Sequence, residues 1–296
     1  MAANGVDESS FWPKLVQVMT SPCLHSFVLF RRFLLPASLL LGVAQAQAGL
    51  VLHYTFEETS GTSTADSSGG GHTGTLTNMT GSEWTTGKTG GGLSFDGNND
   101  YITLPAAAHP TGSEVSVAFW SKGEVGLAKN YLLHSQAGGR TLTIHLPYNG
   151  SVTWDVGNGG GSYDRISKSA LASEVEGSWV HWAFTKNATT GFMNIYHNGS
   201  LWHSDGGKGM TLATSGNPIT NFYLGGGGSM SHNFEGTIDD FRMYDHALST
   251  SEVSSLAAGG GAGAPEPAET FAFLGLLVAA GLGYREWRFR RKAKAA

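Results

Sequence analysis

Hydrophobic and polar residues alternate with a period of two in several stretches between residues 49 and 258. The clearest of these stretches are 93–95, 115–120, 142–146, 180–184 and 193–196. Alternation rich in β-branched and aromatic residues is typical of strands that bury one face and expose the other. Asn198-Gly199, which follows the last stretch, predicts a hairpin turn because both residues tolerate a positive φ.

Glycine clusters at 69–71, 90–92, 159–161 and 225–228 separate these stretches. One segment, 249–256, has the pattern of a helix, with Ser249 or Thr250 as its N-cap and Glu252 in the first turn. Short strands separated by turns predict an all-β domain over residues 49–258, built as a two-sheet antiparallel sandwich. The glycine-rich segment 259–264 is expected to be a flexible linker.

The first 48 residues have the pattern of a secretory signal peptide. Arg31 and Arg32 precede an apolar stretch at 33–43, which is followed by small residues that include Ala46-Gln47-Ala48. A charged region, an apolar region and a small-residue cleavage site in this order predict export and removal of residues 1–48. Met19 is an alternative start, which would give a signal of more usual length.

Residues 265–296 form three blocks: the tripeptide Pro265-Glu266-Pro267, an apolar run at 271–283, and a basic tail. The tail contains Arg285, Arg288, Arg290 and Arg291. Such an apolar run rises about 20 Å as a helix, which is short of the ~30 Å of a bilayer's hydrocarbon core. This order of blocks resembles the PEP-CTERM sorting signal of bacteria, which exosortase-type enzymes process. The resemblance implies a short transmembrane segment at 271–284 and delivery to the cell surface, outer envelope or extracellular matrix; an unprocessed anchor helix is the alternative.

Charge narrows the range of partners for the domain between the two signals. Residues 49–264 contain 18 acidic and nine basic side chains, a net charge of −9. This balance disfavours nucleic acid and anionic surfaces, and it suits a secreted domain that takes up a hard cation. The only cysteine of the chain, Cys23, lies in the predicted signal, so the predicted domain has no disulfide.

Five longer motifs follow one another in the order of a known family. They are YTFEE at 54–58, ADSSG at 65–69, GLSFDGNNDYI at 92–102, GSWVHWAFT at 177–185 and FEGTIDDFRMYDHALS at 234–249. Together they resemble the laminin-G-like, concanavalin A-type jelly-roll domain, and they cover nearly all of residues 49–258. The resemblance implies a jelly-roll fold. Because that fold occurs in lectins, adhesion modules and glycosidases, it does not by itself determine the function.

The resemblance also implies a structural calcium ion. Asp239 matches the usual ligand at the start of the closing strand, and Asp66 is the candidate partner from the opening loop. In the alternative interpretation, Asp66 begins an Asx turn, and Asp239 or Asp240 pairs with Arg242. The segment 96–100 imitates the first half of an EF-hand loop but lacks its glycine and glutamate, so we expect a polar hairpin connection there.

Aromatic and polar residues near turns are candidates for carbohydrate binding. Trp154 and Trp202 are predicted platforms for a sugar ring, and Tyr163 and Asp164 beside a glycine cluster would supply a further ring and an acceptor. The alternative for each is packing against a neighbouring loop. His181 alternates within a strand and is expected to be structural.

The sequence does not contain the catalytic motif of glycosidases that resemble this fold. Those enzymes carry a Glu-x-Asp-x-x-Glu strand, which places carboxylates on one face, and no such run occurs here. We therefore expect a non-enzymatic surface module that binds carbohydrate or extracellular matrix. The alternatives are a structural component of a matrix or biofilm, and a divergent polysaccharide hydrolase or lyase.

Overall fold

The computed structural model describes residues 49–126, 129–212, 216–226 and 232–260. Eight strands form the first sheet, sheet A: β1 (Leu50–Tyr54), β4 (Trp84–Thr86), β5 (Gly91–Asp96), β7 (Glu114–Gly123), β12 (Val180–Asn187), β13 (Phe192–His197), β14 (Ser200–Asp205) and β16 (Glu235–Tyr244). Their order is β14-β13-β12-β7-β16-β5-β4, and β1 pairs with one end of β16.

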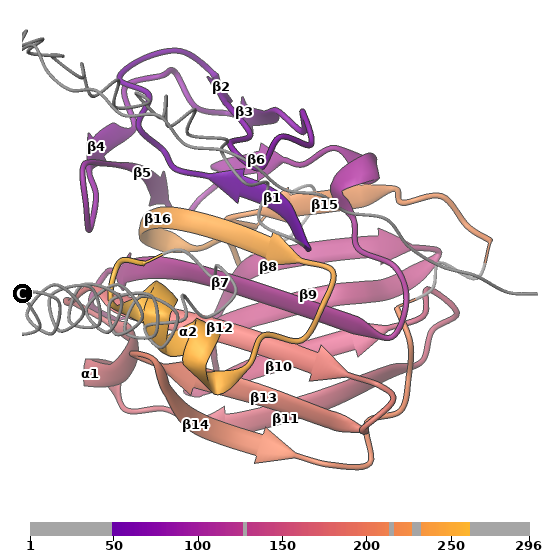
Figure 1. Cartoon of the computed structure of the whole chain (residues 1–296). Coiled ribbons are helices and arrows are strands. Elements are labelled where there is room, and N and C mark those ends of the chain that lie inside the picture. The colour runs from indigo at the N-terminus through magenta and orange to yellow at the C-terminus, as the bar shows by residue number, and fades with distance from the viewer. Residues whose placement is uncertain (1–48, 127–128, 213–215, 227–231, 261–296) are drawn as a thin grey trace, which may run out of the picture. The chain divides into compact units, whose positions relative to one another are not determined.

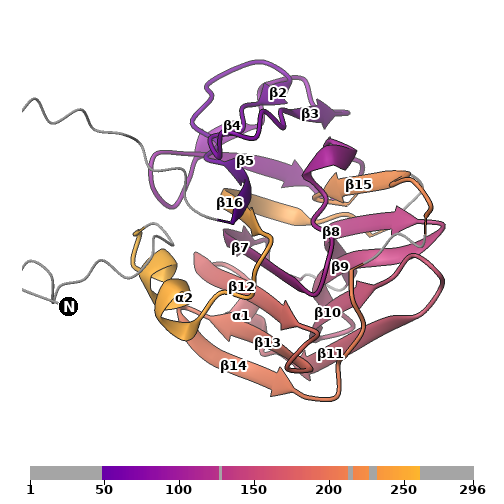
Figure 2. The same cartoon turned by 45° about the vertical axis from the view of Figure 1, so that its right-hand side comes forward.

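The second sheet, sheet B, also has eight strands: β2 (Ser63–Thr64), β3 (Gly74–Thr77), β6 (Tyr101–Thr103), β8 (Lys129–Ala137), β9 (Gly139–Tyr148), β10 (Ser151–Gly157), β11 (Tyr163–Ser169) and β15 (Asn221–Leu224). Their order is β11-β10-β9-β8-β15-β6-β3-β2. Three short helices complete the described chain: η1 (Ala106–Ala108), α1 (Ala172–Val175) and α2 (Thr250–Ala257). Figures 1 and 2 show the two sheets packed face to face, with α2 beside sheet A.

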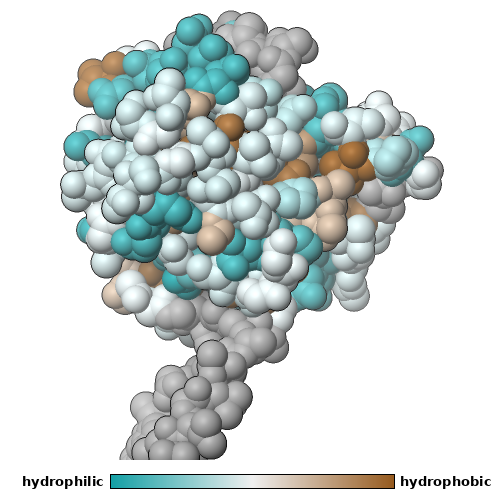
Figure 3. Space-filling model, turned by 90° about the horizontal axis from the view of Figure 1, so that it is seen from above, coloured by the Kyte–Doolittle hydropathy of each residue, from teal (hydrophilic) through white to brown (hydrophobic). Residues whose placement is uncertain are grey.

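The core lies between the sheets and is rich in aromatic rings. Phe119 and Phe184 of sheet A stack with their ring centroids 6.0 Å apart, and Trp154 of sheet B packs against Phe184 at 5.8 Å. Burial of apolar surface stabilises by about 25 cal/mol per Å², so these large rings contribute much of the driving force. Seen from above, the surface is mostly hydrophilic or near neutral, with few strongly hydrophobic residues (Figure 3).

The strands and the helix predicted from local patterns are confirmed. The five predicted stretches lie in β5, β7, β9, β12 and β13. Asn198 and Gly199 have φ values of 49° and 79° and connect β13 to β14, as the hairpin prediction requires. Helix α2 begins after Ser249, whose side chain accepts a hydrogen bond from the Glu252 N–H in a reciprocal capping box.

One connection differs from the prediction. The polar segment after Asp96 does join two strands, but β5 belongs to sheet A and β6 to sheet B. The segment therefore crosses between the sheets and is not a hairpin. The Asp96 side chain accepts hydrogen bonds from the N–H groups of Asn98 and Asn99, which bend the chain at this corner.

Both predicted signals fall outside the described residues. This applies to residues 1–48, to Pro265, Glu266 and Pro267, to segment 271–284, and to Arg285, Arg288, Arg290 and Arg291. Within the described ranges, no helix has both the length and the apolar character needed to cross a membrane.

Candidate functional site

A hollow of about 270 Å³ lies on the face of sheet B that is turned away from sheet A. Strands β8 to β11 pair in sequence order, and their alternate side chains Leu133, Ile144, Trp154 and Ile166 point into the core. The side chains of His145, Thr153, Tyr163 and Arg165 alternate with these and project to the opposite face. Register shifts where β8 and β10 pair with β9 place Tyr131, Arg140 and Tyr148 around the same hollow. The residues that line the hollow are Tyr131, Arg140, His145, Tyr148, Thr153, Tyr163 and Arg165.

Asp155 anchors the two arginines of the hollow. Arg165 donates from Nε to Oδ1 at 2.6 Å and from Nη2 to Oδ2 at 2.8 Å, a bidentate pair. Arg140 Nη1 donates to Oδ2 of the same carboxylate. The Asp155 side chain has an exposed fraction of 0%, against 23% for Arg140 and 44% for Arg165. The hydrogen bonds that Arg165 donates to Asp155 raise the pKa of Arg165, so the guanidinium stays charged.

Close backbone packing positions Arg140 beside this carboxylate. Gly157 lies at the end of β10, where a Cβ atom would come within 2.3 Å of the Arg140 carbonyl oxygen. Only glycine fits this approach without a backbone shift. In the β10–β11 ladder Asp155 lies opposite Arg165, which explains the second contact.

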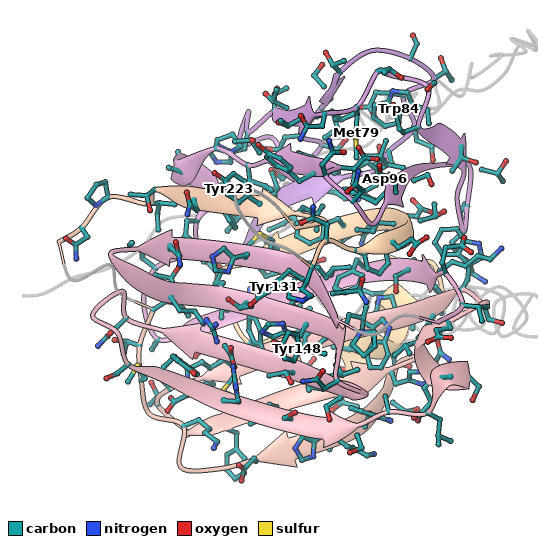
Figure 4. The ribbon with its side chains drawn as sticks, turned by 180° about the vertical axis from the view of Figure 1, so that it is seen from behind. Met79, Trp84, Asp96, Tyr131, Tyr148 and Tyr223 are labelled. Carbon is teal, nitrogen blue, oxygen red and sulfur yellow. The ribbon has the colours of Figure 1, made fainter. Side chains whose placement is uncertain are left out.

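Three tyrosines surround the charged pair. Tyr163 lies under both guanidinium groups, with the Cζ atoms of Arg140 and Arg165 at 4.7 and 5.2 Å from its ring centroid. The rings of Tyr131 and Tyr148 both contact His145, at centroid distances of 4.4 and 5.0 Å, and they meet each other at 6.3 Å. Figure 4 shows Tyr131 and Tyr148 close together on the face of sheet B turned to the viewer. The hollow thus presents aromatic faces next to oriented hydrogen-bond donors.

Of the four residues predicted to bind a ligand, only Tyr163 lines this hollow. The prediction for Trp154 is wrong, because its side chain is fully buried between the sheets and has no face open to a sugar. It alternates with Asp155, so the aspartate rather than the tryptophan reaches the outer face.

Trp202 and Asp164 take part in packing and ion pairing elsewhere. The Trp202 ring meets Trp182 edge-on at 5.6 Å, donates from Nε1 to Glu174, and has Lys168 Nζ over its face at 4.1 Å. These contacts match the alternative of packing against neighbouring segments. Asp164 Oδ2 accepts hydrogen bonds from Lys186 Nζ at 2.6 Å and from the Met210 N–H at 2.8 Å.

Asp66 has the geometry of the predicted Asx turn. Its Oδ1 accepts from the His53 N–H at 3.0 Å and from the Ser68 N–H at 2.9 Å, while its Oδ2 accepts from the His72 N–H at 3.0 Å. Bonds from three backbone donors engage both oxygens and connect the opening loop to β1. The residues that line the hollow beside Asp239 do not include Asp66.

Asp239 is buried in β16, beside a second hollow of about 230 Å³ that is also lined by Glu57 and Asp240. Its Oδ2 accepts from the N–H groups of Lys88 and Thr89 at 2.8 and 3.0 Å. Burial raises the pKa of Asp239 to about 6. Across the described residues, no three His, Cys, Asp or Glu side chains are grouped closely enough to hold one metal ion. The fit to calcium is therefore partial: one buried carboxylate is present, without a complete ligand set.

Asp240 pairs with Arg242, as the alternative interpretation predicted. The Arg242 Nη2 atom is 2.9 Å from Asp240 Oδ1, and His53 Nε2 is 2.6 Å from the same oxygen. Asp240 has a φ of 52°, and the register of β16 on β7 shifts between Asp239 and Arg242. This β-bulge turns the two neighbouring aspartates to different partners.

His181 is a buried strand residue, as expected, and its ring meets Trp120 edge-on at 5.2 Å. Its Nδ1 atom has no hydrogen-bond partner among the described residues. Burial lowers the pKa of His181 to about 4, which keeps the ring neutral near pH 7. The neutral ring explains how it persists in the interior.

Sequence reasoning missed Asp155 and all but one of the residues that line the hollow on sheet B, namely Tyr131, Arg140, His145, Tyr148, Thr153 and Arg165. The available signal was the turn Asn149-Gly150, whose residues have φ values of 50° and 75° and connect β9 to β10. That turn sets the register, in which Thr153 lies opposite His145. Period-two alternation from there would have placed Asp155 on the same face as His145.

Comparisons with known proteins agree with this fold. Domain 4 of the extracellular arabinanase AbnA of Geobacillus stearothermophilus, solved in complex with arabinotriose, is 25% identical and superposes with a TM-score of 0.54 over 71% of this chain and 99% of that one. The binding domain of Paraclostridial Mosquitocidal Protein 1 is 19% identical with a TM-score of 0.57, and the receptor-binding domain of botulinum neurotoxin C/D mosaic serotype is 17% identical with a TM-score of 0.54. Both comparisons cover 71% of this chain, which spans about half of each toxin structure (52% and 51%).

No curated protein sequence matches the chain. A family profile does match residues 96–254, which include β7 to β15 and all of the residues that line the hollow on sheet B. The profile is Laminin_G_3, and it covers more than half of the chain. The sequence motifs of this chain, its two antiparallel sheets and the similar solved structures agree with the profile. The chain belongs to the concanavalin A-like lectin/glucanases superfamily.

Proposed function

We propose that this protein is a surface-sorted, non-enzymatic module that binds carbohydrate through the hollow on sheet B. The observation that carries the proposal is the combination of three tyrosine rings with two arginines held by a buried aspartate. Ligand sites combine apolar or aromatic walls with a few oriented polar groups. Aromatic faces suit the C–H surfaces of a sugar ring, and the guanidinium N–H groups suit its oxygens.

The number and pairing of the acidic side chains near the hollow favour a binding role over catalysis. A glycosidase of the usual type needs two carboxyl groups placed on either side of the scissile bond. Among the described residues that line the hollow or ion-pair with its arginines, Asp155 is the single acid, and two guanidiniums already engage it. Its charge is compensated, which does not suit the role of general acid or nucleophile. The names of the similar structures include several binding domains.

A polysaccharide array probed with the full chain tests this proposal. We expect wild-type protein to bind at least one polysaccharide, and Tyr163→Ala to lose about tenfold or more in affinity, since an aromatic anchor contributes on the order of 1–2 kcal/mol. Phe192→Ala is the matched control, because Phe192 is a comparably exposed ring on sheet A. Equal binding by all three proteins would reject this hollow as the site, and absence of any bound glycan would favour the structural matrix alternative. Release of products from a bound polymer would establish the hydrolase or lyase alternative.

We further propose that Asp239 contributes to a structural calcium site. The support is its buried carboxylate, with a raised pKa, beside a hollow that is also lined by Glu57; the other acid of the hollow, Asp240, is already paired with Arg242. A bound cation would compensate the carboxylate charge, and an ion that binds only the folded state stabilises it by about 2.7 kcal/mol at 100 times its Kd. The melting temperature measured with calcium and with EGTA tests this. A rise with calcium that disappears in Asp239→Asn is expected, and equal melting of wild-type protein in both solutions would reject the ion.

For the termini, we propose export followed by processing at the Pro265-Glu266-Pro267 signal by an exosortase-type enzyme. The support is the sequence alone, with its apolar run and basic tail. Mass spectrometry of the surface-exposed protein is expected to find a C-terminus upstream of residue 271. Replacement of the tripeptide by three alanines is expected to leave the intact chain in the membrane fraction, whereas identical products from both chains would reject this signal.

A further inference from the structure

The hollow on sheet B is a basic spot on an otherwise acidic domain. Residues 49–260 contain 18 acidic and nine basic side chains, and only three of the basic residues are arginines. Two of these three, Arg140 and Arg165, meet at this hollow. They share the single carboxylate of Asp155, so the cluster has one positive charge in excess. Burial lowers the pKa of His134 and His145 to about 4, so these neighbouring rings add no charge near pH 7.

The two guanidiniums retain donors beyond those that Asp155 uses. Each guanidinium has five N–H donors. The bonds to Asp155 engage two donors of Arg165 and one of Arg140. Both side chains line the hollow, and 44% of the Arg165 side chain is exposed. The remaining N–H groups are therefore available to a ligand on the open side of the pair.

The orientation of these donors is set before a ligand arrives. The buried carboxylate holds the guanidiniums from one side, and the Tyr163 ring lies against both of them. A surface arginine would lose side-chain freedom on binding, whereas these two have lost much of it on folding. The planar donors of a fixed guanidinium match the two oxygens of a carboxylate, and arginine is the residue that proteins use for this bidentate recognition.

We propose that the hollow binds a sugar that carries a carboxylate, such as a uronic acid unit of an acidic polysaccharide. The carboxylate lies against Arg140 and Arg165, and the ring contacts the tyrosines. This inference rests on the proposed glycan-binding function and names its ligand class. The net charge of −9 over residues 49–264 repels polyanions in general, so binding depends on this one cluster and not on a broad basic surface. Affinity is expected to fall as ionic strength rises, because the pair is partly exposed to solvent.

Calorimetric titration of the full chain with matched ligand pairs tests the inference. Oligomers of polygalacturonate are compared with the same oligomers after reduction of the carboxyl groups to alcohols, and alginate oligomers provide a second uronate backbone. We expect at least one carboxylated oligomer to bind more than about tenfold tighter than its reduced counterpart, because hydrogen bonds between charged groups are stronger than those to a neutral alcohol. Equal affinity for both members of every pair would overturn the inference and leave the proposed function intact. If the polysaccharide array also finds no glycan, the proposed function itself fails.

Variants of the pair separate charge from geometry. Arg165→Ala is expected to lose the preference for the carboxylated oligomer, and Arg165→Lys is expected to recover little of it because lysine cannot form the bidentate contact. Lys122→Ala removes the same charge from an exposed position on β7 and is expected to bind like wild type. Melting temperatures confirm that each variant is folded. A sulfated galactan that binds as tightly as the uronate would also overturn the inference, since the site would then recognise charge alone.

Discussion

Replacement of Asp164 by asparagine tests whether this residue is structural, as the contacts indicate. Lys186 has an exposed side-chain fraction of 0%, and its Nζ lies 2.6 Å from Asp164 Oδ2 and 2.9 Å from the Lys208 carbonyl oxygen. Burial lowers the pKa of Lys186, and Asp164 opposes that effect. Asp164→Asn keeps an acceptor for the Met210 N–H but leaves the lysine without its counter-charge.

The expected cost follows from the burial of the pair. Removing one partner of a buried ion pair destabilises by about 3–5 kcal/mol. Because 18% of the Asp164 side chain is exposed, the lower end applies, about 3 kcal/mol. For a domain of this size that corresponds to a loss of roughly 6–12 °C in melting temperature. Lys186→Met removes the buried charge, so the double variant Asp164→Asn with Lys186→Met is expected to recover most of the stability.

Urea unfolding of the wild type, both single variants and the double variant gives the coupling between the two residues. The aspartate variant is expected to be the least stable of the four, because it leaves the fully buried lysine charge uncompensated, and the methionine variant is expected to lose less, because the Asp164 side chain that it leaves unpaired is 18% exposed to water. The reasoning is refuted if Asp164→Asn has the same urea midpoint as wild type, or if the double variant is no more stable than Asp164→Asn. Glycan affinity of Asp164→Asn should equal that of wild type, since the side chain points away from the hollow.

Three further predictions concern stability. Trp154→Ala is expected to cost about 3–5 kcal/mol in urea unfolding because its ring is fully buried, whereas the partly exposed Trp202→Ala should cost less; equal losses would contradict the assigned burial. Ser249→Ala removes the N-cap of α2 and is expected to cost about 1 kcal/mol, with Ser255→Ala, at an exposed position of the same helix, as the near-neutral control. Burial lowers the pKa of His109, His134, His145 and His181 to about 4. As the pH falls, these rings are therefore protonated in the unfolded chain before they are protonated in the folded one. The free energy of unfolding keeps its full value above the ordinary histidine pKa of about 6.5 and falls towards pH 4, by up to about 3 kcal/mol per ring. Asp100 and Asp239, with pKa values raised to about 6, act in the opposite sense and reduce the slope; urea midpoints that stay constant from pH 7 to 4.5 in wild type and in His181→Phe would refute the histidine contribution.

Features determined by neighbouring residues could be predicted from the sequence. The alternation in β7 and β12, the Asn198-Gly199 turn and the capping box of α2 each depend on interactions within a few residues, and the structure has all of them. The jelly-roll sandwich could be predicted because its motifs extend along most of the domain.

The site could not be predicted, because it depends on which strands become neighbours. Arg140, Asp155 and Arg165 come from three strands, and only the register brings them together. Trp154 was placed on the surface by its residue type, although it shares the alternation of Val152 and Val156 and faces inward with them. The corner after Asp96 shows the same limit: the local sequence predicts a turn, but the partner strand decides which sheet the chain enters.

The pairing of β1 with β16 has a mechanical consequence. Leu50 lies opposite Tyr244 in an antiparallel ladder, and the Asp245 N–H donates to the Gly49 carbonyl oxygen, so the outer ends of this strand pair, the start of β1 and the finish of β16, lie at the same end of sheet A. A force that pulls these ends apart would load the hydrogen bonds one after another and unzip the pair. Shearing, which loads all bonds of a ladder together, would require the ends to be at opposite ends of the strands. Resistance to tension between the two sides of the domain therefore depends on the packing of α2, whose Val253 and Leu256 are buried against Tyr244 and Leu248, because the β1–β16 pair would unzip once α2 detached.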